Sequence, residues 1–183
     1  LKSDSWAGFI WFQAMLAAYD PALYEGVCDG SIAYTDEKVV EVMNQWKDML
    51  DKGYFSAPMT NVDMAKSVAT GSVAMELEPN YEATTIVNDY GLDSKEDLGT
   101  FVLPSVDGAK KIVFYEIAPL CVSSTSKDKD AAIEALKSWF TKENQTVFTD
   151  ITGFLCSSQV TVDNECVNQM VAYTTDSDNY SMM

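Results

Sequence analysis

The sequence predicts an α/β protein that is rich in helix and has a short mixed sheet. Several stretches carry apolar residues at helical spacing, short apolar runs typical of strands lie between some of them, and glycine or proline stands at many of the boundaries. Hydrophobic residues make up 47% of the 183 residues, which is enough for a packed core. No stretch reaches the ~18 consecutive apolar residues that a membrane-spanning helix needs.

The chain is predicted to begin with two helices. The first covers residues 5–19 and ends before Asp20-Pro21, because a residue that precedes proline is biased away from helical geometry. A helical turn over residues 21–27 follows. Proline stands at its first position, where the missing N–H costs no hydrogen bond.

The clearest predicted helix covers residues 36–52. Thr35 is expected to cap its first turn, and Gly53 is expected to end it in the left-handed conformation. Its apolar residues recur every three to four positions, which predicts one buried stripe. The stripe consists of Val39, Met43, Trp46 and Leu50. Trp46 is therefore interpreted as a core residue rather than as a ligand contact.

The rest of the chain alternates helices with short strands, which is the pattern of the α/β class. Further helices are predicted over residues 61–69, 79–90, 130–141 and 143–151. Strands are predicted over residues 72–77, 98–103 and 112–123. The helix over residues 130–141 is expected to bury a face made of Ala132, Leu136, Trp139 and Phe140.

The charge and the absence of histidine exclude several function classes. There are 28 acidic residues against 12 lysines, and the net charge of −16 disfavours binding to nucleic acid or to an anionic membrane. The charge is interpreted as a means of solubility, with attraction of cationic ligands as the alternative. Without histidine, Ser-His-Asp catalysis, Cys-His catalysis and His-ligated metal sites are impossible. We predict no cofactor and no metal.

The four cysteines leave two interpretations open. None of them forms a C-x-x-C pair, so a metal knuckle or a thioredoxin-type site has no support. Cys156 and Cys166 are closest in sequence and could close a short loop as a disulfide. The alternative is that all four are small thiols that pack like other apolar groups.

Five segments in a fixed order resemble a known family. They read SWAGFIWFQAMLAAYDP, YTDEKVVEVMNQWKDMLDKGYF, ATGSVAMELEPNY, LGTFVLPSVDG and IAPLCVSSTSKDKDAAIEALKSWFTKENQ. The set resembles the extracellular solute-binding proteins of ABC importers, the family that includes maltose-binding protein. The resemblance implies a type II periplasmic-binding-protein-like fold. It also implies a non-enzymatic protein outside the cytoplasm that binds oligosaccharide and delivers it to permease subunits.

The resemblance also implies a division into lobes. Residues 1–104 would form most of the C-terminal lobe, residues 105–150 would return to the first lobe, and residues 151–183 would come back to the second lobe and stop short. The segment LGTFVLP resembles a hinge crossing. The rest of the first lobe is expected to precede Leu1. A periplasmic protein or a cell-surface lipoprotein is expected, with any lipid anchor outside this chain.

One local match leads to the turn that carries a sugar-stacking residue in the family. Gly71 and Ala74-Met75 match the family pattern G-x-x-A-M, and Pro79-Asn80-Tyr81 occupy the place of its G-x-W turn. Proline thus replaces glycine, and tyrosine replaces tryptophan. Tyr81 keeps a flat face and a polar tip, so the resemblance implies that it stacks on sugar. The change leaves the identity of the sugar open.

The candidate ligand-binding residues are aromatic rings for sugar faces and carboxylates for hydroxyls. They are Trp6, Trp11, Glu78, Tyr81, Tyr115 and Glu116. Core packing is the alternative for the two tryptophans, and a solvated strand face is the alternative for Glu78.

Two alternatives of other classes remain. Glu76 and Glu78, two residues apart on a predicted strand, could act as the paired carboxylates of a glycoside hydrolase. The same fold could also serve a carbohydrate-binding adhesion or sensor module without transport, because a fold does not determine its use.

Overall fold

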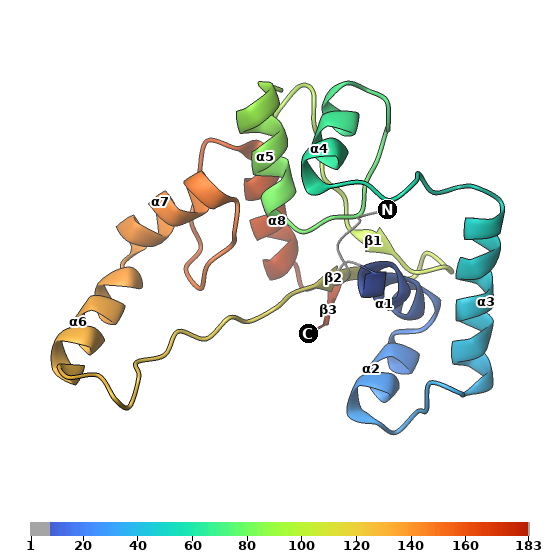
Figure 1. Ribbon diagram of the computed structural model, residues 1–183, viewed down its shortest axis with the longest axis horizontal. Coiled ribbons are helices and arrows are strands. Elements are labelled where there is room, and N and C mark those ends of the chain that lie inside the picture. The colour runs from blue at the N-terminus through green and yellow to red at the C-terminus, as the bar shows by residue number, and fades with distance from the viewer. Residues whose placement is uncertain (1–7, 183) are drawn as a thin grey trace. The chain divides into compact units, whose positions relative to one another are not determined.

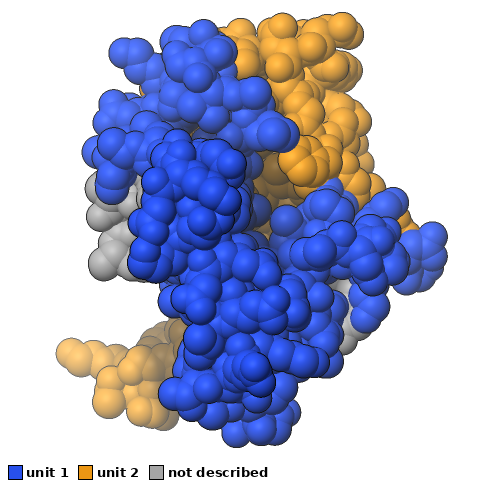
Figure 2. Space-filling view, turned by 90° about the vertical axis from the view of Figure 1, so that its right-hand side faces the viewer, with its two compact units in different colours: residues 1–77, 102–113, 177–182 blue, residues 78–101, 114–176, 183 orange. Residues whose placement is uncertain are grey.

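The computed structural model describes residues 8–182 of the chain. These residues fall into two compact units, which Figure 2 colours separately. Unit 1 comprises residues 1–77, 102–113 and 177–182, as far as the structure describes them, and unit 2 comprises residues 78–101 and 114–176. Each unit is described by itself below.

Unit 1 contains four helices and a small sheet (Figure 1). The helices are α1 (Gly8–Tyr19), α2 (Pro21–Asp29), α3 (Glu37–Asp51) and α4 (Asn61–Ala69). The sheet has the strand order β1-β2-β3, with β1 at Leu103–Pro104, β2 at Lys111–Phe114 and β3 at Asn179–Met182. The helices predicted over residues 21–27, 36–52 and 61–69 are confirmed, and the first predicted helix is confirmed over its described part.

Helix α1 is the centre of the unit 1 core. It carries no charged residue in its first or last turn, and it packs against α2, α3 and β1. Its residues Ala14, Leu16 and Ala17 are buried. Helix α2 follows directly, because the Asp20 side chain accepts a hydrogen bond from the backbone N–H of Ala22 at 3.0 Å and caps the new helix.

A buried phenol joins α1 to α2. The Nε2 amide of Gln13 donates a hydrogen bond to the Tyr24 hydroxyl at 2.8 Å. Burial of Tyr24, with Cys28 beside it, raises the pKa of the phenol to about 12. The neutral phenol is therefore the form that the folded protein favours well above neutral pH.

Helix α3 differs from its prediction in its cap and in its buried face. Asp36 caps it by accepting a hydrogen bond from the backbone N–H of Lys38 at 3.0 Å, so the expectation for Thr35 was wrong. The buried residues are Val39 and Val42, and Trp46 is half-buried. The predicted stripe was wrong at Met43 and Leu50, which are exposed. Helix α3 contacts α1, and its covered face carries Val39 and Val42. Met43 lies outside this face.

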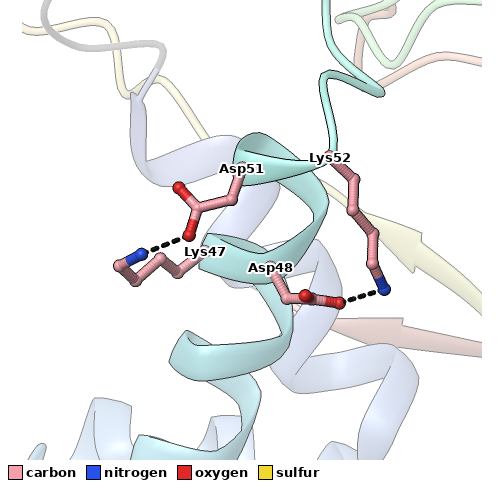
Figure 3. Close-up of polar contacts among 4 residues, drawn as sticks. All are labelled: Lys47, Asp48, Asp51 and Lys52. Atoms are coloured by element: carbon pink, nitrogen blue, oxygen red, sulfur yellow. Dashed lines mark hydrogen bonds and ion pairs between the residues drawn. The ribbon is translucent and has the colours of Figure 1, made fainter.

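The outer side of α3 carries ion pairs near its C-terminus. Figure 3 shows Lys47 paired with Asp51 and Lys52 paired with Asp48. In each pair the two residues are four positions apart and largely exposed, so the pairs support the helix only weakly. Gly53 follows with a φ of 70°, which confirms the predicted left-handed end.

The sheet is shorter than the sequence predicts. Strands β1 and β2 form an antiparallel pair in which Leu103 faces Ile112. A turn joins them, and the backbone N–H of Val106 in this turn donates to the carbonyl oxygen of Ala18 at 2.7 Å, which ties the hairpin to α1. The predicted strand over residues 72–77 was wrong, because this fully described stretch is irregular.

The other two predicted strands are present only in part. Of residues 98–103, only Leu103 lies in a strand, and of residues 112–123 only positions 112–114 do. Beyond β2, residues 115–121 are exposed and form no regular structure, although the structure describes all of them. An apolar run becomes a strand only where a neighbouring strand pairs with it, and these residues are not paired in that way.

Unit 2 is built from helices (Figure 1). They are α5 (Tyr81–Tyr90), α6 (Lys129–Trp139), α7 (Lys142–Thr152) and α8 (Glu165–Thr175). Helix α5 packs against α7 and α8, and Val160, Val162 and Val167 form a small buried cluster. Helix α8 also holds the segment before β1, since the Tyr173 hydroxyl donates to the carbonyl oxygen of Thr100 at 2.9 Å. The sequence did not predict α8 as one helix.

Helix α6 corrects a prediction about burial. All of its residues are described, and none of them is buried. Trp139 is 42% exposed and Phe140 is 46% exposed, so the predicted buried face was wrong at these two positions, while Ala132 and Leu136 are half-buried. The helix contacts α7, which shields only part of its apolar side.

All four cysteines lie in the described part of the chain and are free thiols. The disulfide between Cys156 and Cys166 is therefore not formed. Cys156 lies 3.2 Å from the Thr149 hydroxyl, and the buried Cys166 in α8 has its sulfur 3.5 Å from the carbonyl oxygens of Ser94 and Leu98. Burial raises the pKa of the Cys166 thiol, so this side chain behaves as a small apolar group.

Candidate functional site

The turn before α5 is held against the loop that follows α7. The Asn80 side-chain amide donates a hydrogen bond to the carbonyl oxygen of Gly153. Gly153 has a φ of 74°, and a Cβ at this position would lie 2.4 Å from the Thr84 hydroxyl and 2.9 Å from the Tyr81 Cα. Only glycine fits both this conformation and this close approach. The first turn of α5 and the Gly153 loop thus form one fixed assembly in unit 2.

Four aromatic rings continue from this assembly, and we call them the aromatic row: Tyr81, Phe154, Phe148 and Trp139. The Tyr81 and Phe154 ring centroids are 5.2 Å apart, with the planes tilted by 46°. Phe154 stacks on Phe148 at 6.3 Å and 16°, and Phe148 meets Trp139 edge to face at 5.1 Å. Such geometries are favourable for aromatic pairs. The row spans three helices, from the start of α5 to the end of α6.

Two carboxylates flank Tyr81 along the chain. Glu78 precedes the turn and is half-buried, whereas Glu82 lies in the first turn of α5 and is only 2% exposed. Carboxylates near a helix N-terminus are favoured by the helix dipole. Tyr81 and Glu78 are therefore a ring and an acceptor that lie close together in the sequence of unit 2, on either side of the Pro79-Asn80 turn.

The other predicted residues are more dispersed. Trp11 lies in unit 1 and packs edge to face on Phe55 at 4.8 Å, which favours its alternative role in packing. Tyr115 and Glu116 lie beyond β2 in the irregular stretch of unit 2 and are exposed. Trp6 lies outside the described residues.

The structure weakens the geometric argument for paired catalytic carboxylates. That argument needed a strand over residues 72–77 to place Glu76 and Glu78 on one face. The stretch is described in full and is not a strand. Alternation along a pleated strand therefore no longer brings the two carboxylates to one side.

Unit 1 contains a second aromatic group that the sequence did not reveal. Phe12 contacts Tyr34, with centroids 6.3 Å apart and planes at 29°, and Trp46, with centroids 6.4 Å apart and planes at 17°. Tyr34 is largely exposed. The Trp46 indole N–H is buried and has no hydrogen-bond partner among the described residues. The half-buried position of Trp46 agrees with its predicted packing role.

A shallow hollow of about 520 Å³ lies along α8 in unit 2. Its lining is polar and small aliphatic: Gln159, Val160, Thr161, Glu165, Asn168, Val171, Ala172 and Thr175. The Asn168 side-chain amide already makes two hydrogen bonds to the Val162 backbone. It accepts from the N–H at 3.0 Å and donates to the carbonyl oxygen at 2.9 Å. Of the predicted ligand-binding residues that the structure describes, none lines this hollow.

The sequence led to Tyr81 as a predicted site residue but did not indicate the residues that pack around it. Phe154 meets Tyr81 from a distant part of the chain, and helical or strand periodicity carries no information on such a contact. The one available signal was Gly153, which marks the end of a helix but not what the next residue touches. Within residues 8–182, no group of acidic and cysteine side chains is arranged to hold a metal ion.

Comparison with known proteins gives one clear result. A family model described as bacterial extracellular solute-binding protein matches residues 2–175. Neither the curated proteins nor the solved structures give a significant match. Among residues 8–182, no helix has the length and apolar composition of a membrane span. Because the family match extends over nearly the whole sequence, this chain belongs to the bacterial extracellular solute-binding proteins.

Proposed function

We propose that this chain is part of the carbohydrate-binding component of an ABC importer. Family membership supports a substrate-binding role in transport and a location outside the cytoplasm. The proposal adds that the solute is an oligosaccharide. Its main support is the first turn of α5, where the Tyr81 ring packs against Phe154, with the half-buried Glu78 three residues earlier in the chain.

A sugar needs two kinds of partner. Its C–H faces pack on flat aromatic rings, and its hydroxyls donate to fixed acceptors such as carboxylates. Tyr81 would supply a ring and Glu78 an acceptor. The full set that we propose to bind ligand is Trp6, Trp11, Glu78, Tyr81, Tyr115 and Glu116.

The division into lobes is part of the same proposal. Residues 1–104 and 151–183 would belong to the second lobe, and residues 105–150 would belong to the first. The exposed apolar residues of α6 support this proposal, because soluble proteins bury large apolar groups wherever a neighbouring surface is present. ABC permease subunits would be the partners, and any lipid anchor would lie outside this chain.

The test is the affinity of the full-length protein for oligosaccharides, measured by calorimetry. Tyr81→Ala should weaken binding by about 1–3 kcal/mol, because it removes the stacking ring. Tyr54→Ala is the matched control, since Tyr54 lies in unit 1 and is 69% exposed, and it should leave the affinity unchanged.

Two results would count against the proposal. An unchanged affinity of the Tyr81→Ala protein would remove Tyr81 from the site. Release of shorter sugars during incubation with the intact protein would favour the glycoside hydrolase alternative over a binding protein.

A further inference from the structure

We propose that Phe154 is a second stacking ring of the carbohydrate site, and that the two rings together select ligands of at least two sugar units. This inference rests on the proposed carbohydrate-binding function. It concerns a residue that the sequence did not suggest.

The position of Phe154 beside Tyr81 is set by the backbone. Asn80 donates to the carbonyl oxygen of Gly153, so the residues that directly precede the two rings are bonded to each other. The space at Gly153 is too small for a Cβ, and the loop therefore lies directly on the first turn of α5. Rings held in this way lose little conformational entropy when a ligand binds.

The other rings of the aromatic row further restrict the rotamers of the Phe154 side chain. Phe148 stacks on it with nearly parallel planes, and Phe148 in turn contacts Trp139. A ring in contact with two other rings, here Tyr81 and Phe148, has few alternative rotamers. Despite these contacts, Phe154 is 46% exposed. It is thus a fixed apolar surface that still faces solvent.

The angle between the rings indicates the size of the ligand. Tyr81 and Phe154 are tilted by 46°, so their faces point in different directions. One flat sugar ring cannot lie on both faces at once. Two linked sugar units can, because a glycosidic bond lets consecutive rings adopt different tilts. The pair should therefore favour a disaccharide or a longer chain over a monosaccharide.

The experiment compares matched sugars on the full-length protein. The probes are glucose with maltotriose and cellotriose, xylose with xylotriose, and mannose with mannotriose, each titrated by calorimetry. The wild-type protein should bind one trisaccharide at least about tenfold more tightly than its monosaccharide. Phe154→Leu should reduce trisaccharide affinity about tenfold or more, because it keeps apolar volume but loses the flat face.

Two further variants separate stacking from packing. Phe154→Tyr should restore trisaccharide affinity, since it restores the flat ring. Ile151→Ala, at a 67% exposed apolar position of α7, is the matched control and should bind like the wild type. Thermal unfolding of each variant shows whether it is folded. A merely structural role would lower the unfolding temperature and would not change the preference for trisaccharide over monosaccharide.

Each outcome has a definite meaning. If Tyr81→Ala weakens binding and Phe154→Leu does not, the inference about Phe154 is wrong and the carbohydrate function stands. If the wild-type protein binds none of the sugars, the carbohydrate function fails and the inference falls with it. Should the Phe154 variants not fold, 4-fluorophenylalanine at position 154 gives a ¹⁹F signal in a folded protein. A trisaccharide that binds without shifting that signal overturns the inference.

Discussion

Helices α1 and α7 both carry apolar residues, but the residues that they bury are of opposite kinds. In α1 the apolar residues Ala14, Leu16 and Ala17 are buried against neighbouring elements of unit 1. In α7 the buried residues are the polar Gln145 and Thr149, whereas its apolar residues are largely exposed. An apolar face therefore shows what a helix could bury, and the neighbours decide what it does bury.

The polar side of α7 has a specific role in unit 2. The Gln145 side-chain oxygen accepts hydrogen bonds from the Ser158 N–H at 3.1 Å and from the Ser157 hydroxyl at 3.3 Å. Thr149 lies against the Cys156 thiol. These contacts satisfy buried polar groups and hold the loop after α7 in place. Unit 1 is thus organised by an apolar helix and this part of unit 2 by a polar one.

The largest expected effect tests the comparison directly. Leu16→Ala should lower the free energy of unfolding by about 2–5 kcal/mol, because it opens a cavity in a core where Leu16 is 2% exposed. Ile151→Ala on α7 should change it by less than about 0.5 kcal/mol, since that side chain is exposed. Urea unfolding followed by circular dichroism measures both. A similar loss for both variants would show that the α7 face is covered in solution.

The second effect concerns the loop after α7. Gly153→Ala should destabilise the protein by about 2–4 kcal/mol, because it adds a steric clash to a left-handed backbone conformation. Gly91→Ala is the matched control: its φ is also positive, at 72°, but a Cβ there meets nothing within 4 Å. It should cost only about 1 kcal/mol, from the backbone alone. Equal unfolding temperatures for the two variants would contradict the close packing of Gly153 on α5.

The smallest effect is a pH dependence in unit 1. The pKa of Tyr24 is about 12 in the folded protein and near 10 in the unfolded chain, so the stability that the neutral phenol confers is complete below pH 10 and is lost as the pH rises through 12. Tyr24→Phe should cost about 1 kcal/mol at neutral pH, through the lost hydrogen bond from Gln13. At about pH 11 the cost should be smaller than at neutral pH. Urea unfolding at the two pH values measures the difference. A cost that grows with pH would exclude a raised pKa.

Helix ends were the part of the fold that the sequence predicted best. Gly53 and Gly91 end α3 and α5 with positive φ, as glycine after a helical pattern indicates. Strands were predicted poorly, because a strand depends on a partner elsewhere in the chain. In the candidate site, the prediction of Tyr81 came from local resemblance. The contact with Phe154 could not be predicted, since it depends on how α5 and α7 pack.

Unit 1 draws on three separate stretches of the chain, and this sets an order on its formation. Helices α1, α2 and α3 follow one another directly, so their mutual contacts can form early. Strand β3 (Asn179–Met182) is the neighbour of β2, which precedes it by many residues. During synthesis the sheet therefore stays incomplete until the ribosome has released residue 182, long after the helices beside it have emerged.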